Sequence, residues 1–268
     1  MGIISEMLSY PFMVRALIGG LLVSLCASLL GVSLVLKRYS MIGDGLSHVS
    51  FGSLSIALAA GWSPLKVSIP VVVLAAFFLL RITEHGKVKS DAAIAMISAS
   101  ALAIGIIVTS LTTGMTTDVS SYMFGSILAM SAEDVKLSLV LSVFVLILFI
   151  VFYHKIFAIT FDETFARATG VKAGVYNTLI AVLTAVTIVL GMRMMGALLI
   201  SSLIIFPALT SMRVFKSFKG VVWSSGILSV ICFCIGMTAS YLCSTPAGAS
   251  VVLVNLAAFL LFTLFTII

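Results

Sequence analysis

The chain has 268 residues, of which 62% are hydrophobic and 9% charged, and its mean hydropathy is +1.31. These values exclude a soluble globular protein, because too few polar residues exist to cover its surface, and they are typical of multi-pass membrane proteins. The net charge of +6 indicates basic cytoplasmic loops rather than a nucleic-acid partner. We therefore expect one all-α, multi-pass transmembrane domain over residues 1–268.

Apolar segments recur along the whole chain, and each has about the length, roughly 17–25 residues, that crosses ~30 Å of hydrocarbon in a lipid bilayer. They cover residues 14–36, 39–60, 64–80, 91–112, 135–153, 175–192, 195–212, 220–242 and 247–268. We expect the segment 195–212 to be broken or re-entrant, because Gly191 and Gly196 flank its start and Pro207 interrupts it. The sequence therefore predicts a bundle of eight or nine transmembrane helices.

Basic residues predict how these spans are oriented. If Lys37 and Arg38 are cytoplasmic, alternation of the spans places most of the 15 Lys and Arg residues on the same side. Cytoplasmic loops of membrane proteins carry this excess of positive charge. We therefore expect an external N-terminus and an external loop 113–134. The C-terminus is inside with nine crossings and outside with eight.

Asp44 and His48 lie inside the second apolar segment. A charged group in hydrocarbon costs at least ~2.5–3.5 kcal/mol, so such residues indicate a functional site. Positions i and i+4 share a helix face, and a carboxylate and an imidazole together can bind a divalent cation. If the helix begins near Arg38, His48 lies ~15 Å along it, near the middle of the membrane. The alternative is structural: Asp44 caps the helix and His48 hydrogen-bonds to it.

Residues 161–172 form the longest polar stretch on the cytoplasmic side. The pattern predicts a short helix with Asp162 and Glu163 near its start and Gly170 as its C-cap. Phe161, Phe165 and Ala168 fall close to one face and could enter a groove on a partner protein. On composition alone, a loop helix at the membrane surface is equally compatible with the pattern.

Five short motifs in order resemble permease subunits of bacterial ABC-type importers for zinc and manganese. They are Gly-Asp-x-Leu-Ser-His at 43–48, Tyr-Met-Phe-Gly-Ser-Ile-Leu-Ala at 122–129, Phe-Asp-x-x-x-Ala-x-x-x-Gly at 161–170, Gly-Ala-Leu-Leu-Ile-x-Ser-Leu-Ile-Ile-x-Pro-Ala at 196–208, and Tyr-Leu-Cys-Ser-Thr-Pro-Ala-Gly-Ala at 241–249. The resemblance runs from about residue 14 to the C-terminus. It implies a type II-like importer permease that pairs with a second copy of itself. It also implies two ATP-binding cassette subunits on the cytoplasmic face and an extracytoplasmic metal-binding protein outside.

The resemblance also assigns roles to residues. Asp44 and His48 match positions that bind the metal during passage, so Zn²⁺ or Mn²⁺ is cargo and no cofactor is bound permanently. The segment that contacts the ATPase matches Phe161, Asp162, Glu163, Phe165, Ala166, Arg167 and Gly170. The chain departs from the family pattern at Glu163-Thr164, where a proline is common, and at Ser244, where an acidic residue is common.

The chain has no phosphate-binding Gly-x-x-x-x-Gly-Lys-Ser/Thr motif, so we expect a transport subunit whose ATP hydrolysis is carried by a partner, and not an enzyme. The alternative is a secondary metal/proton carrier that uses the same Asp/His pair, but it leaves residues 161–172 without a role. One Asp and one His are compatible with zinc and with manganese. The resemblance favours zinc, through Leu203–Ala208 and the Thr245–Gly248 turn.

Overall fold

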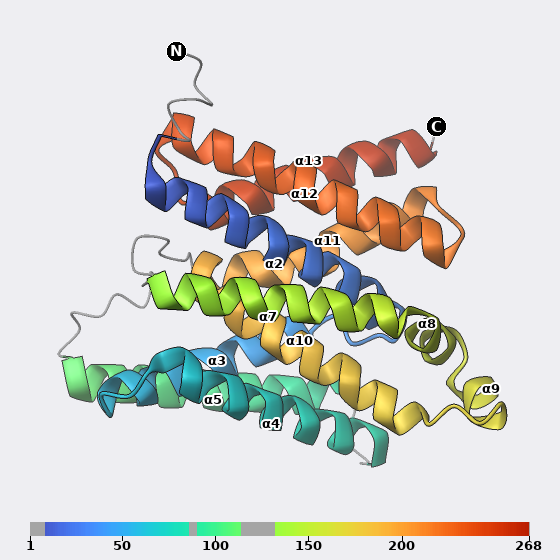
Figure 1. Cartoon of the computed structure of the whole chain (residues 1–268), viewed down its shortest axis with the longest axis horizontal. Coiled ribbons are helices and arrows are strands. Elements are labelled where there is room, and N and C mark those ends of the chain that lie inside the picture. Colours follow the sequence, from blue (N-terminus) through green and yellow to red (C-terminus); the bar gives the residue numbers. More distant parts are fainter. Residues whose placement is uncertain (1–8, 86–89, 114–131, 268) are drawn as a thin grey trace.

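The computed structural model describes residues 9–85, 90–113 and 132–267, and within these ranges it contains helices and no strand (Figure 1). The first four helices are α2 (Pro11–Leu36), α3 (Ile42–Ala59), α4 (Pro64–His85) and α5 (Ser90–Thr113). The middle group is α7 (Ala132–Val151), α8 (Tyr153–Phe161) and α9 (Glu163–Ala168). The last four are α10 (Ala173–Met195), α11 (Ala197–Val214), α12 (Phe218–Cys243) and α13 (Ala247–Ile267). The predicted all-α bundle is confirmed.

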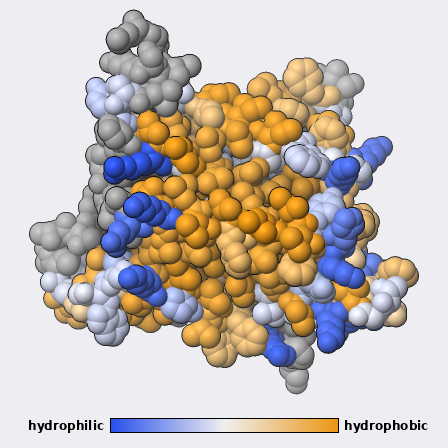
Figure 2. Space-filling view, in the orientation of Figure 1, coloured by the Kyte–Doolittle hydropathy of each residue, from blue (hydrophilic) through white to orange (hydrophobic). Residues whose placement is uncertain are grey.

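Seven of these helices are long and apolar enough to cross a membrane, and α7 and α8 form an eighth candidate that is bent by 68°. Figure 2 shows the corresponding surface, in which hydrophobic side chains cover the middle and hydrophilic ones gather at the two ends. Surface of this kind is stable in lipid and not in water. The chain is therefore a multi-pass membrane protein.

Helix α3 is not among those candidates, although it has 18 residues and is long enough to cross about 27 Å. Its glycines, serines, Asp44 and His48 lower its hydropathy. The helix packs against α4, α5, α10 and α11, and 13 of its residues are buried. A polar helix is tolerated here because other helices, rather than lipid, surround most of it.

The expectation that segment 195–212 is broken at Pro207 is wrong. Helix α11 continues through Pro207 to Val214, and the break lies instead at Gly196, whose φ is +89°. Neighbouring helices hold a proline-containing helix together in a membrane, and α11 packs against α2, α12 and α13. The contact with α2 is close: a Cβ atom on Gly31 would lie 2.1 Å from the carbonyl oxygen of Ile204.

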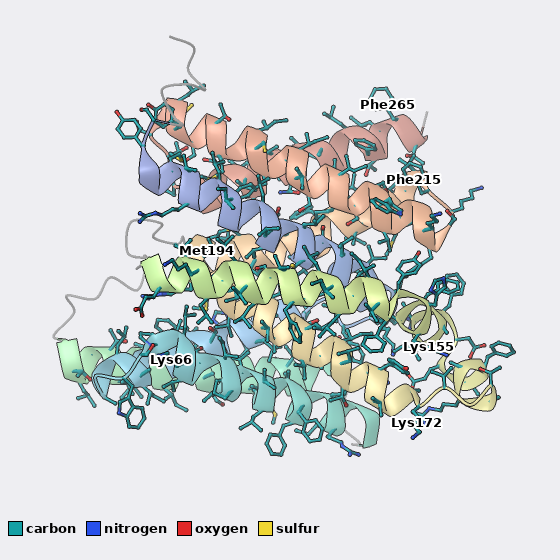
Figure 3. All side chains as sticks on the ribbon, in the orientation of Figure 1. Lys66, Lys155, Lys172, Met194, Phe215 and Phe265 are labelled. Atoms are coloured by element: carbon teal, nitrogen blue, oxygen red, sulfur yellow. The ribbon has the colours of Figure 1, made fainter. Side chains whose placement is uncertain are left out.

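The helices run back and forth between two ends of the bundle. Helices α8 and α9 lie at one of them, which we call the α9 end (Figure 1). Figure 3 places Lys155 and Lys172 at the α9 end and Lys66 at the opposite end. Helix α2 begins opposite the α9 end, whereas α13 stops at it (Figure 1), as expected for an odd number of crossings. The predicted external loop 113–134 lies largely outside the described residues, which omit 114–131.

Candidate functional site

A tight connection leads from α2 into α3. Its backbone closes α2 by two hydrogen bonds, from Arg38 N to Val35 O at 3.0 Å and from Tyr39 N to Leu34 O at 2.8 Å. This is the pattern of a Schellman motif, in which the residue after the C-cap takes a left-handed conformation. Arg38 takes it with φ +63°, although glycine is usual there.

Helix α3 therefore begins at Ile42, later than the expected start near Arg38. His48 lies six residues into the helix, or ~9 Å along its axis at 1.5 Å per residue, so the predicted ~15 Å was too long. Asp44 falls in the first turn of α3. A negative charge is favourable there, because the helix dipole is positive at its N-terminus.

The side chains of Asp44 and His48 face each other across one helical turn. His48 Nε2 lies 3.7 Å from Asp44 Oδ2, and the two side chains are 19% and 47% exposed, respectively. That distance is longer than a hydrogen bond, and the N-cap of α3 is Met41, without a side-chain capping bond. The structural alternative for the pair, a cap plus a hydrogen bond, is therefore not what the structure contains.

The separation of these two atoms suits a metal ion. Two ligand atoms held ~2.1 Å from a tetrahedral zinc lie ~3.4 Å apart, close to the 3.7 Å between Nε2 and Oδ2. Among the described residues no group of three or more His, Cys, Asp or Glu side chains surrounds a common point. As a candidate metal site, the pair would supply two of the ligands.

Small residues pack α3 closely against its neighbours. A Cβ atom on Gly45 would lie 2.6 Å from Ile94, and one on Gly52 would lie 2.7 Å from the carbonyl oxygen of Ala101. The Ser47 hydroxyl donates to the Asp44 carbonyl oxygen at 2.7 Å. The glycines thus allow α5 to approach α3, which is the ordinary packing role of small residues in membranes.

The predicted helix after residue 161 is present as α9. The Asp162 carboxylate caps it by accepting a hydrogen bond from Phe165 N at 2.9 Å. At the other end, Gly170 N donates to Arg167 O at 3.0 Å and Val171 N donates to Ala166 O at 2.9 Å. Gly170, with φ +84°, follows the C-cap Thr169, one position later than expected. Both ends of this helix are therefore encoded locally.

Two aromatic side chains project from this region. Phe161 is 67% exposed and Phe165 is 66% exposed. They do not share one continuous helix, because Asp162 is extended (φ −148°, ψ 97°) and separates α8 from α9. Ala168 is also exposed, whereas Ala166 is buried. The segment thus presents an exposed apolar surface at the α9 end.

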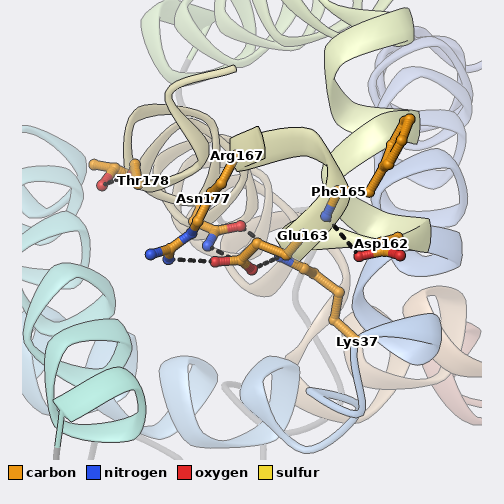
Figure 4. Close-up of polar contacts among 8 residues, drawn as sticks. Lys37, Asp162, Glu163, Phe165, Arg167, Asn177 and Thr178 are labelled. Atoms are coloured by element: carbon orange, nitrogen blue, oxygen red, sulfur yellow. Dashed lines mark hydrogen bonds and ion pairs between the residues drawn. The ribbon is translucent and has the colours of Figure 1, made fainter. Parts of the chain in front are cut away.

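Glu163 points the other way, into a polar cluster that we call the Glu163 cluster and that contains Lys37, Arg167 and Asn177 (Figure 4). Its Oε1 accepts from Arg167 at 2.6 Å, and its Oε2 accepts from Lys37 and from Asn177, each at 3.1 Å. Burial would raise the pKa of the Glu163 carboxyl, but the hydrogen bonds from Asn177, Arg167 and Lys37, with the charge of Lys37, lower it to about 2. The carboxyl group is therefore ionised throughout the physiological range.

With this geometry in view, comparison with known proteins identifies the family. A family model described as "ABC 3 transport family" matches residues 9–266. The chain belongs to this family. It is a permease, the membrane-spanning subunit of an ABC transporter, and not an enzyme. The family assigns the driving force to ATP hydrolysis on a partner, which decides against the secondary carrier.

Individual relatives are similar over nearly the whole permease. A "Probable metal transport system membrane protein" of Treponema pallidum is 32% identical, over 95% of this chain and 96% of the relative. The "Manganese transport system membrane protein MntC" of Halalkalibacterium halodurans is 27% identical, over 93% and 85%. The "High-affinity zinc uptake system membrane protein ZnuB" of Haemophilus influenzae is 27% identical, over 94% and 97%.

A solved structure described as "PsaBC from Streptococcus pneumoniae in complex with Fab" matches the permease with a TM-score of 0.86 and 28% identity. The match covers 97% of this chain and 94% of that one. The fold of the bundle described above is therefore shared by a solved structure.

Two members of the Glu163 cluster were not predicted from the sequence. Lys37 lies 126 residues before Glu163, and Asn177 lies 14 residues after it. Lys37 was interpreted only as a loop charge that orients the permease. Asn177 carried the one available signal, because it is a strongly polar side chain near the start of an apolar segment.

Proposed function

We propose that this permease imports a divalent transition metal ion, zinc in preference to manganese, across the bacterial cytoplasmic membrane. Relatives of similar length are named for metal, manganese or zinc transport. The observation that carries the proposal is the Asp44–His48 pair, whose facing atoms are 3.7 Å apart and only partly exposed in the helix that is most enclosed by its neighbours.

Incomplete coordination suits a carrier. A structural zinc site is closed by four protein ligands, and an ion held in that way would not be released. A site with one carboxylate, one imidazole and water binds an ion and lets it leave. Imidazole favours zinc, whereas carboxylate and water also suit manganese, so the ligand chemistry supports the preference for zinc only in part.

We further propose that the ATP-binding subunits dock on residues 161–170. The exposed Phe161 and Phe165 supply apolar anchors. Asp162, Ala166 and Gly170 hold the local structure, through the cap, a buried contact and the left-handed turn. Glu163 and Arg167 form an ion pair at 2.6 Å. An aromatic anchor on a short, well-capped helix is a common element of protein recognition.

The assembly that follows from this proposal contains two copies of the permease, two ATP-binding cassette subunits at the α9 end, and an extracytoplasmic metal-binding protein at the other end. The lipid bilayer surrounds the apolar surface, and no nucleic acid takes part. Membership of the ABC transport family supports a partner ATPase, and in this assembly the permease supplies the path, the metal pair and the docking segment.

The test is metal uptake by the double variant Asp44→Leu/His48→Leu, normalised to the amount of permease in the membrane. Replacing both groups by apolar residues leaves no polar group stranded in the bundle, so folding is preserved even if the pair is structural. If the pair binds the ion in transit, uptake of both Zn²⁺ and Mn²⁺ should fall to background. The control is Thr112→Leu, at an exposed position near the end of α5. Near-normal uptake by the double variant removes the metal-site claim.

A further inference from the structure

The Glu163 cluster joins three segments of the chain into a closed set of contacts. Lys37 is the C-cap of α2, Glu163 opens α9, and Asn177 lies in α10. Lys37 Nζ donates to Glu163 Oε2 at 3.1 Å and also to Asn177 Oδ1, and Asn177 Nδ2 donates to the same Glu163 oxygen. Each of these three side chains therefore contacts the other two, so none of them moves alone.

Lys37 is well placed to pass a displacement onward. Its side chain is only 12% exposed, and it ends α2 directly before the connection to α3. That connection is held by hydrogen bonds from Tyr39 N to Leu34 O at 2.8 Å and from Ile42 N to Tyr39 O at 3.0 Å. A short, hydrogen-bonded connection transmits movement rather than absorbing it, and Asp44 lies two residues after Ile42, the first residue of α3.

A cavity beside the cluster leaves room for such a displacement. Lys37 and Asn177 line it together with Tyr39 and Ile42 of the α2–α3 connection and Ile180 of α10. Protein interiors are close-packed, and tightly filled contacts resist small shifts. The empty space thus borders both the Glu163 cluster and the α2–α3 connection.

We infer that Lys37 and Glu163 form the contact that transmits movement of α9 to the α2–α3 connection and so to the Asp44–His48 pair. The inference rests on the proposed function, because it requires a partner that moves α9 and an ion bound near α3. Lys37 and Glu163 are positioning residues, since neither touches the ion. In the proposed assembly Phe161, the last residue of α8, and Phe165 of α9 contact the ATPase, whereas Glu163 of α9 holds Lys37.

The experiment measures ions imported per ATP hydrolysed by the complete transporter in proteoliposomes, with Zn²⁺ and Mn²⁺ as probes. Lys37→Met keeps the long side chain and removes the charge. Glu163→Gln keeps the shape of the side chain and removes the charge. We expect each to lower the ratio by about 5-fold or more, as for a typical coupling between two sites. Attachment of the ATP-binding subunits to Lys37→Met should be unchanged.

A double-mutant cycle separates this contact from two independent effects. If the residues act through each other, Lys37→Met/Glu163→Gln should lower the ratio no further than either single change. Lys37→Arg, which restores charge and donors, should retain most of the coupling. Lys216→Met removes an exposed lysine at the same end and should behave as wild type. If Lys37→Met does not assemble, the other two variants test the inference. It then requires a lowered ratio in Glu163→Gln and a largely retained ratio in Lys37→Arg.

Two results overturn the inference. One is a wild-type ratio in Lys37→Met, and the other is a loss in the double variant equal to the product of the single losses. In both cases the wild-type transporter still imports metal, so the proposed function stands. If the wild-type complex imports neither Zn²⁺ nor Mn²⁺, the proposed function is wrong and the inference falls with it.

Discussion

At the scale of single residues, the carboxylates of Asp44 and Glu163 differ in how many hydrogen bonds they accept. The Asp44 carboxylate lies 3.7 Å from the imidazole of His48 and is about half exposed. Glu163 accepts hydrogen bonds from Arg167, Lys37 and Asn177. A carboxylate with free lone pairs is available to an ion, whereas one with three donors is fixed in place. The chemistry of these residues therefore differs because their neighbours differ.

The lowered pKa of Glu163 predicts how stability depends on pH. Its folded value is about 2, against an ordinary value of 4.5. The stabilisation from this group is therefore complete above about pH 4.5 and is lost as the pH falls toward about 2. Glu163→Gln should reduce the free energy of unfolding by about 1–3 kcal/mol near neutral pH, at the lower end because the group is partly exposed.

Thermal unfolding in detergent checks this prediction. The difference in unfolding temperature between the wild type and Glu163→Gln should stay constant from neutral pH to about pH 5 and shrink below about pH 4. Glu133→Gln, an exposed glutamate at the other end of the bundle, is the control. A difference that grows on acidification contradicts the assigned hydrogen bonds.

At the scale of elements, a helix can be predicted from the sequence when its start and end are fixed by neighbouring residues, and α9 is the example. The cap of Asp162 and the turn at Gly170 follow from neighbouring residues, so α9 was expected almost as found. Helix α8 was not expected, because the polar residues His154 and Lys155 directly follow the predicted span 135–153 and are typical of a loop. The bend brings Ile156 and Ile159 of α8 into the core, a contact with distant residues that a local pattern does not contain.

Contacts between distant residues also explain why the effect of Pro207 was predicted wrongly and why two members of the Glu163 cluster were not predicted. Pro207 looked like a break because proline removes a helical hydrogen bond, but packing against α2, α12 and α13 keeps α11 continuous. The ion pair between Lys37 and Glu163 joins residues 126 positions apart. Asp44 and His48 were identified because they are one helical turn apart in the sequence itself.

The exposed aromatic residues of the α8–α9 region lead to a prediction about assembly. Phe161→Ala/Phe165→Ala should fold normally, because both side chains are about two-thirds exposed. Removing aromatic anchors from an interface typically costs about 2 kcal/mol or more, which is roughly a 30-fold loss of affinity. The amount of ATP-binding subunit that co-purifies with the permease measures this loss of affinity. The control is Phe144→Ala, at an exposed position in α7, which should co-purify with as much ATP-binding subunit as the wild type does. Equal losses in both variants would indicate general destabilisation.

At the scale of the whole molecule, the charge distribution and the hydrophobic surface indicate one orientation. The apolar band lies between two polar ends (Figure 2), and the α9 end carries Lys155 and Lys172 (Figure 3). By the positive-inside rule this end faces the cytoplasm. The proposed docking segment for the ATP-binding subunits lies at the same end, so this proposal and the predicted orientation depend on each other.

Labelling of introduced cysteines tests the orientation. In a background with Cys234 and Cys243 replaced, because both are exposed, a cysteine at Arg167 should react with a membrane-impermeant thiol reagent only from the cytoplasmic side. A cysteine at Lys66 should react only from outside. Reaction at position 167 in intact cells would reverse the orientation and separate α9 from any cytoplasmic ATPase.

The start of α2 and the end of α13 lie at opposite ends of the bundle (Figure 1). Two copies joined head to tail in one polypeptide would therefore place the second copy upside down in the membrane. A tandem gene duplication could not yield a working single-chain pair without an added transmembrane helix between the halves. Protein engineers who wish to fuse two copies of this permease into one chain face the same constraint.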